Sequence, residues 1–141
     1  MAKTTRNDLL PEVSEFLNGG PLPGVVGGQR VASANRETFI TCDPGTGEPL
    51  TELFAMQRED VDRAVQTAQE AFVKSGWAQL SPNDRGVLLH RLADAVEKRK
   101  KIVAQIEALD CGKVYAQAEA DVQNLVDTVR YFANMALHIE H

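Results

Sequence analysis

The feature that most constrains the fold is a change in the spacing of apolar residues at Arg58. Before it, residues 24–31, 38–42 and 50–56 form three short runs rich in Val, Thr, Ile and Phe, a composition typical of β-strands. After it, apolar residues recur three and four positions apart, as on one face of an α-helix. The sequence therefore predicts short strands followed by helices, with the first two runs paired as a hairpin.

About four helices are predicted after the strands. The first ends near Gly76, and Ser81 has the residue type and the following proline of a second helix start. After the basic residues 98–101 the apolar pattern resumes until Gly112, which can take a left-handed cap, and the last apolar seam runs to the end of the chain. These helices would present apolar faces that need a partner. The stripe predicted for the first consists of Val61, Ala64, Val65, Ala68, Ala71 and Phe72.

The chain divides into three parts. Residues 1–22 are predicted to be an irregular N-terminal arm because "NGGPLPG" breaks regular elements, residues 23–56 hold the strands, and residues 57–141 are helical. A length of 141 residues suits one domain, and 43% hydrophobic with 25% charged residues is typical of a folded, soluble protein.

Charge and hydropathy exclude several classes of partner. The net charge of −5 repels polyphosphate, so we expect no nucleic-acid binding. No apolar run reaches the roughly 18 residues that a membrane span needs, and the first residues lack the apolar stretch of a secretory signal. With two widely separated cysteines and no C-x-x-C pair, we expect reduced thiols and a cytoplasmic location.

The stretch "CDPGTGEPL", residues 42–50, has three possible interpretations. As a phosphate-binding loop it lacks a third glycine and a following helix, and Glu48 would repel a phosphate. As a nucleophile, Cys42 has the anionic Asp43 as its neighbour and no adjacent cation to lower its pKa. A turn between two strands is favoured because Pro44, Gly45 and Gly47 are turn residues.

Other candidate sites are weaker. Cys111 lies at a predicted helix C-terminus, where the helix dipole disfavours a thiolate. The imidazoles of His138 and His141 could hold a metal ion with Glu140, but a frayed helix end is favoured because no further ligand accompanies them. The basic run at residues 98–101 is favoured as a solvated helix face. The residues alone thus show no catalytic constellation.

Five motifs in the same order and spacing resemble the N-terminal part of the aldehyde dehydrogenase superfamily. They are "DPGTGEPL", similar to the family's Asn-Pro-Ala-Thr-Gly-Glu turn, "EDVDRAVQTAQEAF" and "GWAQLSPNDRGVLLHRLADAVE", similar to its first two helices, and "EALDCGK" and "VRYFA". The resemblance covers about residues 22–141 and implies an N-terminal fragment of an α/β, aldehyde dehydrogenase-like fold, with residues 57–141 in its cofactor-binding domain.

The resemblance also implies a chemistry and its limits. In the family a cysteine thiolate attacks an aldehyde, a hydride passes to NAD or NADP, and water activated by a glutamate hydrolyses the thioester. Those groups and the cofactor loop lie downstream of the matched region, and neither Cys42 nor Cys111 aligns with the nucleophile. We therefore expect no catalytic or cofactor-binding residue in this chain, no bound NAD(P), and no activity of the chain alone.

Two pairs of residues match family sites. Thr41 and Asp110 match positions at which some members hold a structural monovalent cation, and Asn124 and Thr128 are predicted to face the substrate tunnel. As a fragment, the chain is expected to form a homo-oligomer or to aggregate through its apolar helix faces. The alternative is a non-enzymatic helical module that binds a protein partner through those same faces.

Overall fold

The structure, a computed structural model, describes residues 8–138. Short strands are followed by helices, as the sequence predicts, and one further helix precedes the strands. In chain order the elements are α1 (Pro11–Asn18), β1 (Gly24–Val26), β2 (Gln29–Val31), β3 (Thr38–Cys42), β4 (Pro49–Phe54), α2 (Arg58–Lys74), α3 (Pro82–Lys98), α4 (Lys100–Cys111) and α5 (Tyr115–Met135), with single 3-10 turns at Trp77–Gln79 and Ala136–His138.

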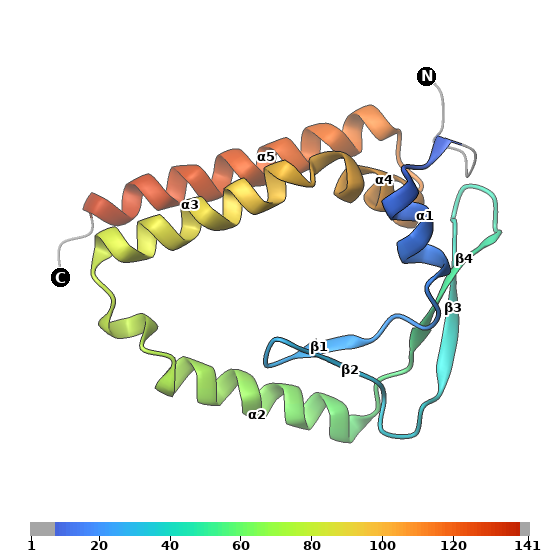
Figure 1. The fold of residues 1–141 in the computed structure, drawn as a ribbon, viewed down its shortest axis with the longest axis horizontal. Coiled ribbons are helices and arrows are strands. Elements are labelled where there is room, and N and C mark those ends of the chain that lie inside the picture. The colour runs from blue at the N-terminus through green and yellow to red at the C-terminus, as the bar shows by residue number, and fades with distance from the viewer. Residues whose placement is uncertain (1–7, 139–141) are drawn as a thin grey trace.

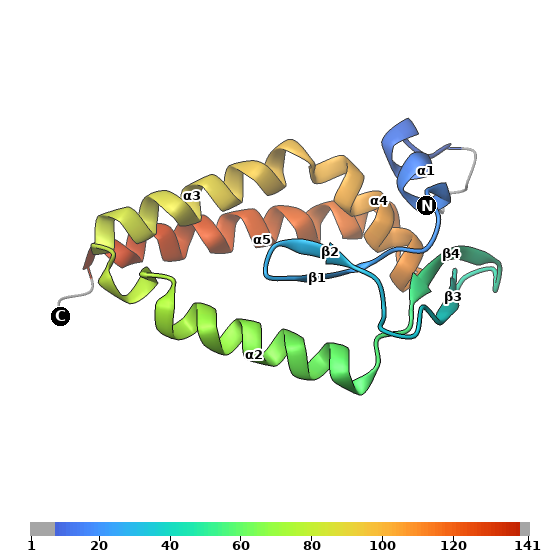
Figure 2. The same ribbon diagram turned by 60° about the horizontal axis from the view of Figure 1, so that its bottom comes forward.

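Two long edges and a β-rich end define the shape (Figure 1). Helices α3 and α5 lie side by side along one edge, α2 lies along the opposite edge, and α1, α4 and the β3–β4 hairpin lie at the end far from the C-terminus. Figure 2 shows the same arrangement from another side, with the β1–β2 hairpin between α2 and the α3–α5 pair. The described part of the chain contains no helix long and apolar enough to cross a membrane.

The strand pairing differs from the prediction in one respect. The first run folds back on itself: β1 pairs with β2, with Val25 opposite Arg30, rather than with the second run. The reason is that Gly27 and Gly28 both have positive φ, 58° and 78°, which is the requirement of a tight two-residue hairpin turn. The second and third runs then pair as β3 and β4, antiparallel, with Thr38 opposite Phe54.

The N-terminal arm is not irregular throughout, which corrects the prediction for residues 1–22. Residues 11–18 form α1, which starts with Pro11 at its first position and places Val13 in a small core with Leu50 and Leu109. Proline suits the first helical turn because a backbone N–H at that position would have no hydrogen-bond partner within the helix. The glycines and prolines after residue 18 hid this short helix, whose stability comes from packing against β4 and α4.

The arm is also held by a side-chain amide. Gln105 on α4 accepts a hydrogen bond from the Leu10 N–H at 2.9 Å and donates one to the Asp8 carbonyl at 3.0 Å. The amide of Gln105 thus pairs with the arm in the way that a neighbouring strand would. Residues 8–18 are therefore part of the folded body.

Helices α3 and α4 start and stop largely where the sequence predicts, whereas α5 ends at Met135, before the end of the predicted seam, whose last residues 139–141 lie outside the described part. Ser81 caps α3 by accepting the Asp84 N–H at 3.1 Å, and Gly112 ends α4 with φ at 65°. A short break at Arg99 separates α3 from α4. The α4–α5 contact is built from small residues, namely Ala104, Ala108, Ala118 and Val122. Small side chains let the helix backbones approach closely.

Helix α2 forms over Arg58–Lys74 as predicted, but its apolar stripe packs on little. Val61, Val65 and Phe72 are 53%, 62% and 82% exposed. Periodicity predicts which side chains share a helix face, whereas burial depends on what lies opposite that face. Within residues 8–138, few residues pack against the apolar face of α2.

Candidate functional site

The turn of residues 43–48 is a closed hydrogen-bonded unit. The Gly45 N–H donates to Asp43 Oδ1 at 2.7 Å, and the Thr46 and Gly47 N–H groups donate to the Asp43 carbonyl at 3.3 and 2.7 Å. The Glu48 N–H donates to Thr46 Oγ1 at 3.2 Å. A phosphate-binding loop needs such N–H groups free to point at the ligand. The prediction of a turn between two strands is therefore confirmed.

Thr41 and Asp110 lie on elements whose ends meet. Thr41 is half-buried on β3, and Asp110 is exposed in the last turn of α4. A Cβ placed on Gly112 would lie 2.9 Å from Pro44 Cγ and 3.6 Å from the Gly45 nitrogen, so the end of α4 packs on the turn that follows β3. Threonine and carboxylate oxygens suit a hard cation, and this pair stays a prediction.

Residues 8–138 contain no group of three or more His, Cys, Asp and Glu side chains that could hold a metal ion. Of the alternative site at the C-terminal end, His138 is described and exposed, whereas Glu140 and His141 lie outside the described residues.

Both cysteines are free and exposed. Partial desolvation of the Cys111 sulfur, together with its 3.6 Å contact to Glu107 Oε1, raises the pKa of this thiol above its usual value. A raised pKa lowers the thiolate fraction at neutral pH and with it the reactivity. The expectation that Cys111 is not a nucleophile stays a prediction.

Asn124 and Thr128 lie one turn apart on the exposed side of α5. Tyr131 and Met135 continue the same row at helical spacing, and they are 59% and 41% exposed. The row therefore combines two polar side chains with an open apolar surface. Its assignment to a substrate tunnel stays a prediction.

Sequence reasoning missed an ion-paired lysine at the junction of α4 and α5. Lys113 Nζ donates to Glu107 Oε1 at 2.6 Å and to Asp121 Oδ2 at 3.1 Å. The two carboxylates raise the pKa of Lys113, and the hydrogen bonds from Gln117 and Lys113 lower that of Asp121. Lys113 is thus a fixed cation rather than a base. The carboxylates lie six and eight positions from it, spacings that become contacts only once the chain turns at Gly112.

A second ion-pair group joins α3 to α5. Arg130 on α5 contacts Asp94 at 2.9 Å and Glu97 at 2.7 Å. The hydrogen bond from Arg130 lowers the pKa of Glu97. Like the Lys113 group, it joins two helices through one cation that two carboxylates share.

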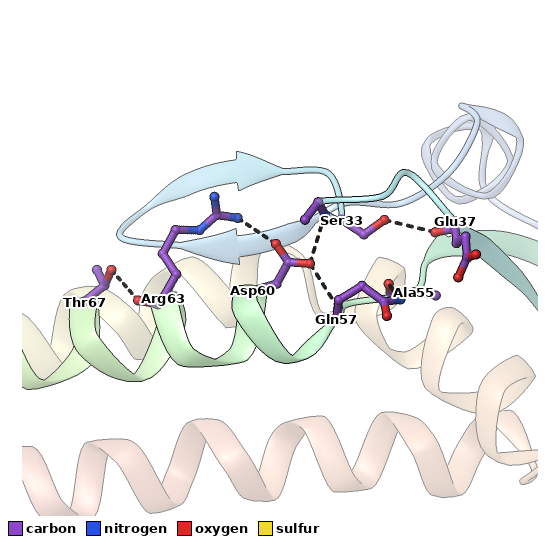
Figure 3. Close-up of polar contacts among 8 residues, drawn as sticks. Ser33, Glu37, Ala55, Gln57, Asp60, Arg63 and Thr67 are labelled. Carbon is purple, nitrogen blue, oxygen red and sulfur yellow. Dashed lines mark hydrogen bonds and ion pairs between the residues drawn. The ribbon is translucent and has the colours of Figure 1, made fainter.

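A further polar group surrounds Asp60 in the first turn of α2, as Figure 3 shows. Asp60 is only 3% exposed, and its Oδ2 accepts hydrogen bonds from the Ala34 and Gln57 N–H groups, each at 3.0 Å. Its Oδ1 accepts one from Arg63 Nη2 at 3.0 Å. The backbone donors, Ala34 first, lower the pKa of Asp60, so this carboxyl is held as an anion.

These groups bind, orient and connect elements of the chain. Cys111 contacts the Glu107 carboxylate, the Ser81 hydroxyl donates to Asp84 at the start of α3, and His90 contacts the Asn134 amide oxygen.

Comparison with known proteins identifies the fold. Residues 31–141 match the model of the aldehyde dehydrogenase family. The chain is 40% identical over 106 residues to a mitochondrial aldehyde dehydrogenase of Equus caballus, covering 74% of this chain and 21% of that protein. It is 40% identical over 109 residues to the cytosolic 10-formyltetrahydrofolate dehydrogenase of Mus musculus, covering 77% and 12%.

A solved structure agrees with the sequence matches. The NAD⁺ complex of an aldehyde dehydrogenase from Bacillus cereus superposes with a TM-score of 0.86 at 35% identity, over 94% of this chain and 27% of that one. The chain thus spans about a quarter or less of the length of the relatives it matches. Sequence and fold agree over most of its length, and the chain belongs to the aldehyde dehydrogenase family.

Proposed function

We propose that this chain is the N-terminal scaffold segment of an enzyme that oxidises an aldehyde to a carboxylic acid with NAD or NADP as hydride acceptor, and that the chain by itself is inactive. The relatives' names and the NAD⁺ in the Bacillus cereus complex support the reaction class. The family resemblance assigns the reactive cysteine, the glutamate and the cofactor loop to sequence beyond the matched region.

The observation that carries the proposal is where the large apolar side chains lie. The buried hydrophobic residues are mostly alanine, and the largest fully buried side chains are Val13 and Val126. Phenylalanine, tyrosine and leucine side chains are exposed instead on α2, α3 and α5, and Trp77 is exposed in the 3-10 turn after α2. Burying a large apolar side chain contributes roughly 1.5–3 kcal/mol, so these faces fit an inner layer covered by further protein.

The exposed apolar residues follow the helices closely. Those of 40% exposure or more on α2, the turn after it, α3 and α5 are Val61, Val65, Phe72, Val73, Trp77, Val87, Leu88, Leu92, Leu125, Tyr131, Phe132 and Met135. We propose that the remaining part of the aldehyde dehydrogenase fold covers them. Exposed as they are in this chain, they would favour a homo-oligomer or aggregation.

Two further assignments follow from the family match. We infer that Thr41 and Asp110 contribute oxygen ligands to a structural monovalent cation, with a further ligand from outside this chain. Asn124 and Thr128 would face the substrate tunnel, because they share the open face of α5 with Tyr131. The free thiols of Cys42 and Cys111 fit a cytoplasmic location, as does the cytosolic name of the mouse relative.

A chimera tests the proposal. Residues 31–138 would replace the superposed segment of the Bacillus cereus enzyme, and NAD⁺-dependent oxidation of an aldehyde would be followed by NADH absorbance. We expect activity from the chimera and none from this chain alone. A folded chimera without activity, or activity of the isolated chain, would contradict the proposal.

A matched pair of variants links the activity to the α2 face. In the chimera, Val65→Asp should abolish activity because it places a charge where protein is expected to cover α2. Gln66→Asp, one residue along on the exposed helix, should leave it intact. The helical interaction module predicts instead that the isolated chain is a monodisperse monomer with one cooperative thermal transition.

A further inference from the structure

Helix α2 has an inverted pattern of burial. All its residues are described, and the only one that is buried is the carboxylate residue Asp60. The side chains of its apolar residues Val61, Val65 and Phe72 are mostly exposed to solvent. The apolar side chains of α2 therefore contribute little to its position, and besides the contact of α2 with β1 it is the polar bonds at its first turn that can set the angle at which α2 leaves β4.

Asp60 bonds to three different parts of the chain. Gln57, at the junction of β4 and α2, donates its N–H to Asp60 Oδ2, and its side chain in return accepts the Asp60 N–H in a capping box. Arg63 contacts Oδ1 from within α2. Ala34 donates its N–H to Oδ2 from the loop between β2 and β3, 26 residues away.

The Ala34 bond distinguishes this arrangement from an ordinary helix cap. A capping box joins a helix only to itself and to the residue before it. Here the same carboxylate oxygen also holds a loop that belongs to the β-rich end. Figure 3 shows Asp60 between that loop and the start of α2.

The loop and the β4–α2 junction are in turn bonded to each other. The Glu37 carbonyl accepts the Ala55 N–H at 2.8 Å and the Ser33 hydroxyl at 3.1 Å. Gln57 Nε2 donates to the Ala55 carbonyl at 2.8 Å. The contacts therefore close a ring: residues 33–37, the 55–57 junction, Asp60, and back to Ala34. A closed ring of short bonds permits fewer orientations than any single bond.

We propose that Asp60 is a positioning residue that fixes the direction of α2 relative to the β3–β4 hairpin, and so sets where the apolar face of α2 points. The Oδ2 bonds to Ala34 and Gln57 fix the angle, whereas the Arg63 contact lies at the surface. What binds to the α2 face rests on the proposed function. The ring of hydrogen bonds around Asp60, which we call the Asp60 ring, lies within residues 33–63 and can be measured on this chain alone.

The experiment measures the distance between α2 and the hairpin. Spin labels would be placed on the natural, exposed Cys42 and on Gln69→Cys, an exposed α2 position, in a Cys111→Ser background. Pulsed electron resonance gives the distance distribution, and hydrogen exchange gives the protection of the Ala34 N–H. Far-ultraviolet circular dichroism reports the helix content.

Four variants distinguish the role of Asp60 in orienting α2 from its role in capping the helix. Asp60→Ala removes both Oδ2 bonds, and we expect loss of the single narrow distance and of Ala34 protection, with helix content kept. Gln57→Ala removes the reciprocal half of the capping box and the Nε2 bond to Ala55 but leaves both Oδ2 bonds, so it should keep the narrow distance and the Ala34 protection. Asp60→Asn retains an oxygen acceptor for the two N–H groups and should restore the narrow distance. Asp62→Asn, an exposed acid two residues along, is the control.

The opposite results would overturn the inference. A narrow distance in Asp60→Ala would show that other contacts set the angle. Loss of the helix content of α2 in Asp60→Ala would show that the carboxylate is needed for helix formation rather than for orientation. Neither result depends on aldehyde oxidation, so failure of the proposed function would leave this test interpretable.

Discussion

Replacing Gly86 by alanine tests how closely α3 and α5 approach. Gly86 is buried on α3, and a Cβ at this position would lie 2.9 Å from the Ala133 carbonyl oxygen on α5. Carbon–oxygen contacts between packed helices are normally about 3.3–3.6 Å. Because the oxygen belongs to helix backbone, it cannot rotate away, and the two helices must separate by a few tenths of an ångström.

Two effects of opposite sign then compete. Alanine is a better helix former than glycine, which would stabilise α3 by about 1 kcal/mol. Forcing an extra methyl group into a tight contact costs about 1–3 kcal/mol. The close contact with a backbone atom places this site toward the middle of that range, so we expect a net destabilisation of about 1 kcal/mol.

Urea unfolding followed by circular dichroism measures the difference. With a slope of about 2 kcal/mol per molar urea, the midpoint should fall by about 0.5 M. Ala95→Gly, at an exposed position of the same helix, is the matched control and should cost about 1 kcal/mol through propensity alone. If Gly86→Ala instead raises the stability by as much as Ala95→Gly lowers it, α3 and α5 do not touch at Gly86 and the argument fails.

Three further outcomes are expected. Val13→Ala should destabilise the chain by about 2 kcal/mol because it opens a cavity under α1, whereas Val25→Ala, 71% exposed, should change the urea midpoint little. Backbone donors lower the pKa of Asp60. Its contribution to stability is therefore complete above the unfolded pKa of about 4 and is lost as the pH falls through the lower folded pKa. The urea midpoint of Asp60→Asn should depend less on pH in that range than the midpoint of the unchanged chain. Cys111 should react more slowly with iodoacetamide at pH 8 than a free model thiol of ordinary pKa near 8.5, and Glu107→Gln should speed it, because removing the carboxylate lowers the thiol pKa.

Local chemistry explains what the sequence predicted well. Ser81 and Gly112 mark helix ends through their own hydrogen bonding and backbone freedom, so neighbouring residues suffice to place them. The turn at Asp43 closes on itself for the same reason. Gly27 and Gly28 carried an equally local signal, a two-glycine hairpin turn, which the broader strand pattern concealed.

Contacts between segments distant in the chain explain the features that the sequence did not predict. The N–H of Ala34 meets Asp60 26 residues later, and Lys113 meets its carboxylates only across a helix break. Helix α1 depends on Leu50 and Leu109, which its own eight residues do not reveal. Thr41 and Asp110 came from family resemblance alone, because neither the spacing nor the charge of these residues singles them out.

On α2 a charged side chain is buried and the apolar ones are exposed, the reverse of the usual arrangement. The apolar spacing of the sequence therefore predicted the helix face correctly but not its burial. In a self-contained domain, apolar side chains hold a helix in place and charged ones face water. On α2 the charged Asp60 is buried at its base, while Val65 and Phe72 are exposed. A helix that must stay oriented before its apolar face is covered needs a polar attachment at one end. Such an attachment is directional, so it can set an angle that apolar contact alone would leave free.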